Sequence, residues 1–256
     1  MKIATFNIND IRKRLGNLTA WLDAAAPDIV CLQELKATDA QVPADEIAAA
    51  GYDMVWRGQT AWNGVAILSR VGKPILVRDA LPGNPRDGQA RYIEAAVAGV
   101  LVACLYAPNG NPQPGPKFDD KLAWMDRLER HAAELVAAGI PAVLAGDFNV
   151  APEAADIYAT RSYDGNALIQ PESRLRFRRL LDQGWTDAVR KLQPEGPAYT
   201  FWDYRRRRWE RDAGLRLDHI LLSEPAARRL RRFAIDRETR AQPGASDHAP
   251  VWVMLE

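Results

Sequence analysis

The chain has 256 residues, a length that suits one large α/β domain or two small ones. Hydrophobic residues make up 47% of it and charged residues 26%, which excludes a disordered or collagen-like chain. The formal net charge of +1 argues weakly against a protein that binds nucleic acid, because such proteins usually carry a basic surface.

Two cysteines are too few for a disulfide framework, and Cys31 and Cys104 each lie inside an apolar run, so we expect two buried, reduced thiols. The N-terminal segment is too short and too polar for a signal peptide, because Asn7 and Asn9 interrupt it. The longest apolar run, Ala95–Ala107, has 13 residues, whereas a transmembrane helix needs about 20. These features predict a cytoplasmic protein that has no membrane partner.

Short segments, many of them rich in Val and Ile and bounded by Gly, Pro, Asn or Asp, predict ten strands. In chain order these are Lys2–Asn7, Ile29–Gln33, Asp53–Arg57, Gly64–Ser69, Arg91–Ala98, Val100–Tyr106, Ala142–Ala145, Ala198–Tyr204, Arg216–Leu222 and His248–Leu255. Apolar residues spaced three and four apart, with Gly or Pro as stops, predict fewer helices. These are Ile11–Ala25, Ala44–Ala50, Phe118–Leu135 and Ser173–Leu181.

The order of these elements indicates the architecture. Ten strands exceed what one open sheet usually holds. Gly99 alone separates two of the strands, which is typical of a hairpin. Hairpins mixed with helices argue against a doubly wound parallel sheet and favour two packed sheets flanked by helices. No linker, repeat or low-complexity tract divides the chain, so we expect a single domain over residues 1–256.

Familiar nucleotide-binding and nucleophile motifs are missing. The chain has no P-loop, no GxGxxG after a strand, and no GxSxG, CxxC or HExxH. Of its three histidines, His131 lies in a charged helical stretch, so we expect it at the surface. His219 and His248 each follow an aspartate directly, in LDHILLS and SDHAPV.

Polar side chains stand at or near the ends of several predicted strands. They are Asn7, Asn9, Glu34, Tyr106, Asn109, Asp147, Asn149, Asp218, Asp247 and His248. Taken singly, Asn and Asp at strand ends are often only turn residues. Taken together they favour a site, because carboxylates buried at one rim compensate one another only if a cation lies among them. Oxygen ligands of this kind suit Mg²⁺ or Mn²⁺ and are poor for Zn²⁺.

The same set suits the hydrolysis of a phosphate ester. Asp247 can orient the imidazole of His248 or raise its pKa. A hydrogen-bonding histidine together with a metal stabilises the charge that develops on the non-bridging oxygens of a scissile phosphate. Asp147, held by Asn149, can take a proton from water, and general-base help of this kind is worth about 10²–10⁴-fold. No residue has the features of an activated covalent nucleophile.

Eight segments of the chain resemble the exonuclease III family of apurinic/apyrimidinic (AP) endonucleases, within the endonuclease/exonuclease/phosphatase superfamily. They are NIN (Asn7–Asn9), LQELK (Leu32–Lys36), NGVAILSR (Asn63–Arg70), YAPNG (Tyr106–Gly110), GDFNVAP (Gly146–Pro152), TFWDYR (Thr200–Arg205), LRLDHILLS (Leu215–Ser223) and SDHAPV (Ser246–Val251). GDFN and SDH alone mark only the superfamily, whereas LQELK, YAPNG, TFWDYR and RLDHILLS narrow the resemblance to the DNA-repair branch. The resemblance covers the chain from Lys2 to Glu256.

The resemblance implies a four-layer α/β sandwich, in which two mixed β-sheets pack face to face with helices on the outside. It also implies Mg²⁺-dependent hydrolysis of the phosphodiester 5′ to abasic sites in duplex DNA, with Mn²⁺ as a substitute metal. Activities of a 3′-to-5′ exonuclease and of a 3′-phosphodiesterase or phosphatase often accompany it in the family. The expected partner is double-stranded DNA with abasic sites or 3′ ends, and we expect a monomer.

Carried over by motif, the family's catalytic residues correspond to Tyr106, Asp147, Asn149, Asp218 and His248. Asp147 would activate or position the attacking water, and Asn149 would bind the phosphate and orient Asp147. His248 would contact the scissile phosphate with Asp218 as its partner carboxylate. Tyr106 would touch the phosphate or help the leaving group.

The metal residues implied by the resemblance are Glu34 as the principal ligand, Asn7 near the metal and Asp247 at the metal side. Some family members carry Asp where Asn9 stands, and this departure weakens any two-metal interpretation here.

The family's substrate-binding residues correspond to Asn109, Phe201, Trp202, Arg205, Leu215 and Leu217. Phe201, Leu215 and Leu217 would wall the abasic sugar, because a sugar without a base enters a small apolar slot that excludes a normal nucleotide. Some relatives have Trp where Leu215 stands, so the smaller residue here loosens the expected discrimination. An alternative is that Phe201 is only an aromatic residue of the hydrophobic core.

Arginines mixed with aromatics over residues 199–211 suit phosphate contacts and stacking on bases, with Trp202 and Arg205 among them. Asn109 would contact the substrate backbone. The run Arg205–Arg208 also fits a solvated hairpin tip, because a charge run often marks only a wet loop.

Two other functions are compatible with parts of the pattern. One is a phosphoesterase of the superfamily that acts on a small phosphate or a lipid, which the basic, aromatic segment and the lack of a membrane-binding stripe argue against. The other is a catalytically inactive DNA-binding module. A ring of carboxylates around an empty metal site would serve no physical purpose in such a module.

The net charge of the chain is an average over two unlike regions. Between Glu172 and Arg240 there are 18 basic and 11 acidic residues, so this stretch carries +7 and the remainder −6. Bound Mg²⁺ would neutralise part of the acidic excess, which includes Glu34 and Asp147. The sequence therefore predicts that the C-terminal third supplies most of the positive charge that faces DNA.

Overall fold

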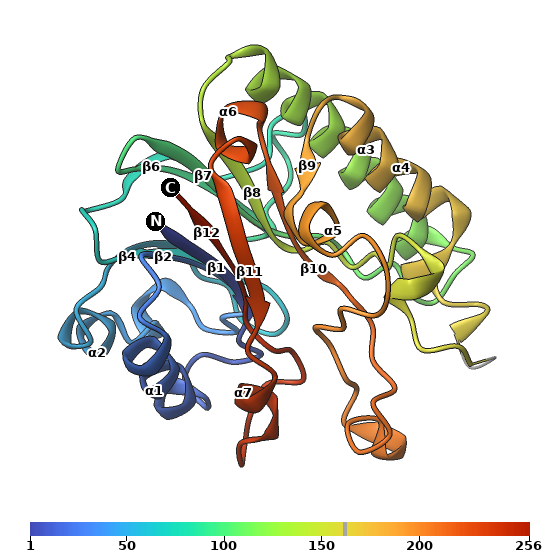
Figure 1. The fold of residues 1–256 in the computed structure, drawn as a ribbon, viewed down its shortest axis with the longest axis horizontal. Coiled ribbons are helices and arrows are strands. Elements are labelled where there is room, and N and C mark those ends of the chain that lie inside the picture. Colours follow the sequence, from blue (N-terminus) through green and yellow to red (C-terminus); the bar gives the residue numbers. More distant parts are fainter. Residues whose placement is uncertain (161–162) are drawn as a thin grey trace.

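Two six-stranded β-sheets form the centre of the computed structural model, which describes residues 1–160 and 163–256 (Figure 1). The first sheet has the order β11 (Leu230–Ile235), β12 (Val251–Leu255), β1 (Lys2–Asn7), β2 (Ile29–Gln33), β4 (Val65–Ser69) and β3 (Asp53–Arg57). The second has the order β5 (Ile75–Arg78), β6 (Tyr92–Val97), β7 (Val100–Tyr106), β8 (Ala142–Asp147), β10 (Asp218–Leu222) and β9 (Thr186–Asp187). Both sheets are mixed, because β1 and β2 are parallel, β7 and β8 are parallel, and the other pairs are antiparallel.

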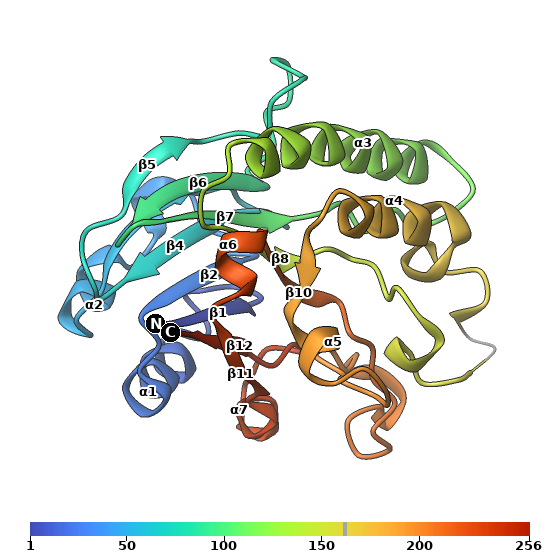
Figure 2. The same cartoon turned by 45° about the horizontal axis from the view of Figure 1, so that its top comes forward.

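Helices cover the outer face of each sheet and complete four layers (Figure 2). Helices α1 (Leu15–Ala25) and α2 (Ala44–Ala49) place Leu18, Leu22 and Ile47 against the first sheet. On the second sheet, α3 (Pro116–Ala137) and α4 (Pro171–Asp182) bury Leu128 and Phe177. The shorter helices are α5 (Ala188–Leu192), α6 (Glu224–Ala227) and α7 (Arg237–Ala241). The expected four-layer α/β sandwich of two mixed sheets is confirmed.

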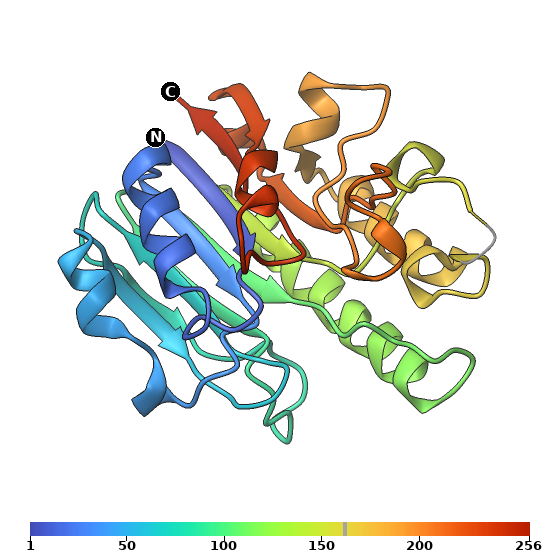
Figure 3. The same ribbon diagram turned by 90° about the horizontal axis from the view of Figure 1, so that it is seen from below.

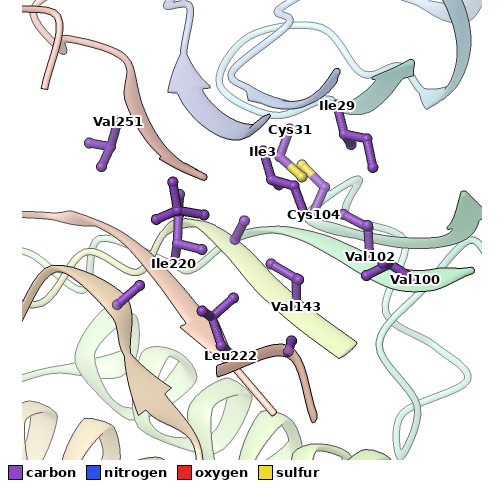
Figure 4. Close-up of a cluster of buried hydrophobic side chains, with 14 of the residues drawn as sticks. Ile3, Ile29, Cys31, Val100, Val102, Cys104, Val143, Ile220, Leu222 and Val251 are labelled. Atoms are coloured by element: carbon purple, nitrogen blue, oxygen red, sulfur yellow. The ribbon is translucent and has the colours of Figure 1, made fainter. Parts of the chain in front are cut away.

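The main core lies between the two sheets, where alternate residues of facing strands meet (Figure 4). Its members include Ile3, Val102 and Ile220, which are fully buried. Cys31 and Cys104 lie in this same core as free, buried thiols, as the sequence predicted. The chain ends lie next to each other because β1 and β12 are antiparallel neighbours (Figure 3).

Most predicted strands are confirmed, and those over Lys2–Asn7, Ile29–Gln33, Asp53–Arg57 and Val100–Tyr106 have the predicted bounds. The expected strand Ala198–Tyr204 is wrong, because Phe201 forms only isolated bridges to Leu215 and His248. The edge strands β5 and β9 and the arginine-rich β11 were not predicted. All residues of β5 are exposed, so it lacks the alternation of polar and apolar residues that marks a half-buried strand.

The expectation of a surface position for His131 is wrong. Its side chain on α3 is 3% exposed, and the two ring nitrogens contact the carboxylates of Glu94 and Glu134. Of the charged residues around it in sequence, Arg130 is exposed, whereas Glu134, one turn later on α3, contacts the imidazole.

None of the helices in the described ranges is both long and apolar enough to cross a membrane.

Candidate active site

Five strand ends bring the candidate catalytic and metal residues to one rim of the sandwich. Asn7 ends β1, Glu34 follows β2, Tyr106 ends β7, Asp147 ends β8, and Asp218 begins β10. The strand register explains the convergence, because Asp147 pairs with Tyr106 on one side and with Asp218 on the other. Side chains that are more than one hundred residues apart in sequence therefore meet.

Asn7 links the two sheets at this rim. Its Nδ2 donates to Glu34 Oε1 at 2.9 Å and to Asp147 Oδ2 at 3.1 Å. The hydroxyl of Tyr106 donates to the same Glu34 Oε1 at 2.8 Å. The backbone of Glu34 has a φ of 55°, a left-handed conformation that costs about 1–3 kcal/mol for a residue other than glycine and persists where its surroundings enforce it.

Lys36 compensates the charge of Glu34, with 2.8 Å between its Nζ and Glu34 Oε2. Burial by itself would raise the pKa of Glu34, but Lys36 and the amide of Asn7 hold the pKa below its usual value. Lys36 Nζ also donates to Asn9 Oδ1 at 2.6 Å, and Asn9 Nδ2 donates to Asp247 Oδ1 at 2.8 Å. Asp247 is thus joined to Glu34 through Asn9 and Lys36.

His248 forms a buried pair with Asp218, with 2.7 Å between Nδ1 and Oδ2. The hydroxyl of Thr200 donates to the same Asp218 oxygen at 2.6 Å. Although burial lowers the pKa of His248, the Asp218 carboxylate raises it to about 10, so the imidazole is cationic at neutral pH. Its Nε2 faces Asp147 Oδ2 at 3.8 Å. Burial raises the pKa of Asp147 to about 7, although the charge of His248 opposes this rise.

Two asparagine amides lie beside these groups. The Asn149 backbone N–H donates to Asp147 Oδ1 at 2.8 Å, and Asn109 Nδ2 donates to Asn149 Oδ1 at 3.1 Å. The GDFN turn requires the glycine that precedes Asp147, because a Cβ at Gly146 would lie 1.9 Å from the Leu105 carbonyl oxygen. The backbone N–H of Asn149, rather than its side chain, contacts Asp147.

The residues fit a divalent cation. Asp147, Asp218 and His248 offer ligand atoms within 4.8 Å of one another, but His248 Nδ1 and Asp218 Oδ2 are committed to their mutual hydrogen bond. The carboxylates of Glu34 and Asp147, which both accept from Asn7 Nδ2, are hard oxygen donors that meet across the two sheets, and Lys36 and Tyr106 also contact Glu34. Such donors suit Mg²⁺, Mn²⁺ or Ca²⁺.

An apolar wall lies next to His248. The rings of Phe201 and His248 are 4.9 Å apart, and Phe201 forms a β-bridge to Leu215. Leu215 and Leu217 are buried and pack in one cluster with Phe201. Arg216 between them points the opposite way and pairs with Asp156 and Asp187 in the interior.

The chain is similar to known proteins over nearly its whole length. Residues 4–248 match the model of the Endonuclease/Exonuclease/phosphatase family. The chain belongs to this family. Exodeoxyribonuclease III of Haemophilus influenzae is 32% identical in an alignment of 264 positions that covers 98% of this chain and 98% of that relative. The chain is therefore a family member of the exonuclease III branch and an enzyme of the nuclease class.

Solved structures of family members share the whole fold. A 3′ phosphatase from Neisseria, bound to a product DNA hairpin, is 40% identical, covers 100% of this chain and 99% of its own, and has a TM-score of 0.96. An AP endonuclease from Archaeoglobus fulgidus is 35% identical, with coverage of 100% and 99% and a TM-score of 0.95.

Within this family fold, the predicted substrate residues differ in exposure. Arg205 is exposed at the tip of the loop after Tyr204, which projects beside α7 (Figure 1). The expectation that Trp202 stacks on DNA does not agree with the structure, because Trp202 is fully buried and donates to Asp212 Oδ1 at 3.0 Å. Arg208 is buried as well, so the run Arg205–Arg208 is not a loop that is solvent-exposed at every residue.

Three residues that support the site were not predicted as site residues. Lys36 lies in the quoted LQELK segment and Thr200 in TFWDYR, so the motifs could have indicated both. Lys121 on α3 donates to the backbone carbonyls of Asn109 and Asn149. No motif marks it, because an isolated lysine in an amphipathic helix usually faces solvent.

Proposed function

We propose that this protein is a DNA-repair nuclease that hydrolyses the phosphodiester 5′ to abasic sites in duplex DNA and also removes nucleotides or blocking phosphates at 3′ ends. The observation that carries this proposal is the convergence of Glu34, Asp147 and the Asp218–His248 pair beside an apolar wall. The relatives described above, an exodeoxyribonuclease, an AP endonuclease and a 3′ phosphatase, support the choice of substrate.

Asp147 and His248 divide the chemistry between them. Asp147, whose pKa burial raises to about 7, takes a proton from the attacking water near neutral pH. His248, held cationic by Asp218, donates its Nε2–H to a non-bridging oxygen of the phosphate as negative charge develops there. No covalent enzyme intermediate is required.

Neutral donors complete the phosphate site. The amides of Asn109 and Asn149 offer N–H groups to the substrate, and the Asn149 backbone N–H keeps Asp147 oriented. Burial and the nearby Glu34 raise the pKa of Tyr106 well above its usual value, so its hydroxyl stays protonated. Its one hydrogen is donated to Glu34 Oε1, and it would donate to the phosphate or the leaving oxygen after turning from that carboxylate.

Mg²⁺, with Mn²⁺ as a substitute, is the proposed cofactor. Glu34 would be the principal ligand, with Asn7 and Asp147 beside it. Asp247 would lie on the metal side of the site, where Asn9 donates a hydrogen bond to it. When bound, the cation supplies positive charge that polarises the phosphate and offsets the two carboxylates. The proposal needs one cation only, since Asn9 stands where a second carboxylate ligand would be.

The apolar wall supplies lesion selectivity. Phe201, which is partly exposed next to His248, would contact a sugar without a base, with the buried Leu215 and Leu217 packed in the same cluster. A normal nucleotide would have to leave the stack and lose its pairing. Exposed arginines near Arg205 contact the phosphate backbone. We propose that residues 1–256 act as one domain, as a monomer and in the cytoplasm.

Three duplexes test this function: one with a single abasic analogue, one intact, and one with a 3′-phosphate at a nick. With Mg²⁺ we expect incision of the first and phosphate removal from the third, without internal cutting of the second. EDTA should abolish both reactions. Equal cutting of the intact and abasic duplexes would contradict the lesion-specific part.

Two further results would redirect the assignment. Hydrolysis of an inositol phosphate without DNA cleavage would indicate a small-molecule phosphoesterase. Tight DNA binding without cleavage of any duplex in Mg²⁺ or Mn²⁺ would indicate an inactive binding module.

A further inference from the structure

A lysine lies inside the protein directly behind the two site amides. Lys121 on α3 is 0% exposed. Its Nζ donates to the Asn109 carbonyl oxygen at 3.2 Å and to the Asn149 carbonyl oxygen at close range. Among the described residues, no carboxylate forms an ion pair with it, and burial lowers the pKa of its amino group to about 7. Its hydrogen bonds go to the two backbone carbonyls.

Burial of a lysine amino group is costly whether or not it carries the proton, and a methionine or leucine would fill a helix position against the core without that cost. A stability role alone therefore does not account for a polar amino group at residue 121. The groups that it binds suggest another role, because both belong to the phosphate site.

Lys121 connects two loops that follow neighbouring parallel strands. Asn109 follows β7 and Asn149 follows β8, and their side-chain amides contact each other at 3.1 Å. Asn149 has a φ of 50°, and in this conformation its N–H reaches Asp147. A donor on its carbonyl oxygen holds the following peptide group, between Asn149 and Val150, and thereby stabilises this backbone conformation of Asn149.

The YAPNG segment leaves space for the lysine stem. A Cβ at Gly110 would lie 2.7 Å from Lys121 Cδ, and the φ of Gly110 is +87°, which side chains rarely adopt. The glycine after Asn109 is thus explained by the close approach of Lys121 as well as by the turn itself.

We propose that Lys121 is a positioning residue, whose buried amino group ties the Asn109 and Asn149 carbonyls together so that the two amides meet the substrate phosphate as one rigid unit. This inference rests on the proposed nuclease function. It predicts that loss of the amino group lowers turnover more than substrate affinity, because misplacement of catalytic groups by about 1 Å costs on the order of 10²-fold.

The first test compares Lys121→Met with Lys117→Met, which removes an exposed lysine one turn earlier on α3. On the abasic duplex we expect kcat of Lys121→Met to fall about 10²-fold, with a much smaller change in KM, while Lys117→Met keeps the wild-type kcat. Wild-type kcat in folded Lys121→Met would overturn the inference, and so would a change confined to KM.

A double-mutant cycle separates positioning from a merely structural role. If Lys121 acts through the amides, Lys121→Met should lower kcat far less in an Asn149→Ala background than in the wild type. An equal loss in both backgrounds would overturn the inference. If Lys121→Met does not fold, Lys121→Gln, which keeps a donor without the charge, takes its place with the same expected non-additivity.

The two proposals fail in different ways. Absence of DNA cleavage by the wild-type protein would remove the nuclease function itself. Normal cleavage by the wild type and by the folded Lys121 variants would remove only the role of Lys121.

Discussion

The protein contains two buried histidine–carboxylate pairs with opposite surroundings. His131, on the buried face of α3, contacts Glu94 through one ring nitrogen and Glu134 through the other. His248 at the rim contacts Asp218 through Nδ1, and in the described part of the chain no hydrogen bond reaches its Nε2. A histidine whose two ring nitrogens both have partners stabilises the fold, whereas a histidine with one ring nitrogen that makes no hydrogen bond can bind a substrate.

The pKa of each histidine is raised, so charge alone does not distinguish the two pairs. Burial opposes both shifts, and Glu94 or Asp218 outweighs it. The difference lies in the second ring nitrogen. In His131 it contacts a second carboxylate, Glu134, whereas in His248 it faces Asp147 without a hydrogen bond. The following predictions test whether this difference separates function from stability.

The largest effect is expected for Asp147→Asn, which removes the proposed base that faces His248 with little change in shape. Cleavage of the abasic duplex should fall about 10²–10⁴-fold in single-turnover kinetics, because water loses its proton acceptor. DNA binding should survive, as measured by fluorescence anisotropy. Asp23→Asn, on the exposed face of α1, is the matched control. Near-normal turnover in Asp147→Asn would refute the assigned role.

His248→Ala should lower kcat about 10²–10³-fold, the range for loss of one preorganised donor to a developing oxyanion. His131→Ala, assayed on the same duplex per folded molecule, should retain the wild-type kcat. Similar losses of kcat in the two variants would remove the distinction between the pairs.

His131→Ala should instead destabilise the fold by about 3–5 kcal/mol, because it leaves the buried Glu94 carboxylate without its main partner. Urea denaturation followed by circular dichroism measures the free energy of unfolding. A change below about 1 kcal/mol would show that Tyr92 and Arg78, which also contact Glu94, satisfy it alone.

The smallest effect is the pH dependence of this stabilisation. Glu94 has a lowered pKa, so its contribution is present above the unfolded value of about 4.3 and is lost as pH falls through the folded pKa. His131 has a raised pKa, so its contribution is present below about 6.5 and is lost as pH rises through the folded pKa. The Tm difference between wild type and His131→Ala should be largest between these pH values, and a pH-independent difference would contradict the pairing.

The predictions from sequence succeeded where the local pattern was strong. The strands Ile29–Gln33 and Val100–Tyr106 are longer apolar runs that are buried, and polar residues at or just after their ends mark the rim. The exposed β5 has only three apolar residues in a row and β11 contains adjacent arginines, so the local pattern marked neither strand; they pair with β6 and β12. His131 was misjudged because the partner that buries it, Glu94, lies 37 residues away.

The basic C-terminal third is a second case in which local sequence was insufficient. Arg208, Arg216 and Arg240 are buried, so part of the +7 charge between Glu172 and Arg240 faces inward and cannot contact DNA. Arg216 binds Asp156 and Asp187 instead. The prediction that this region grips DNA therefore rests on its exposed arginines.

The sequence by itself determined most of the strand segments, the motif residues at their ends and the family, because these depend on residues close together in the chain. Only the tertiary structure decided which atoms meet: Asn7 between Glu34 and Asp147, and Lys121 behind both amides. The physical reason is that strand pairing and sheet packing fix distances between residues that are far apart in sequence, and local pattern carries no record of those distances.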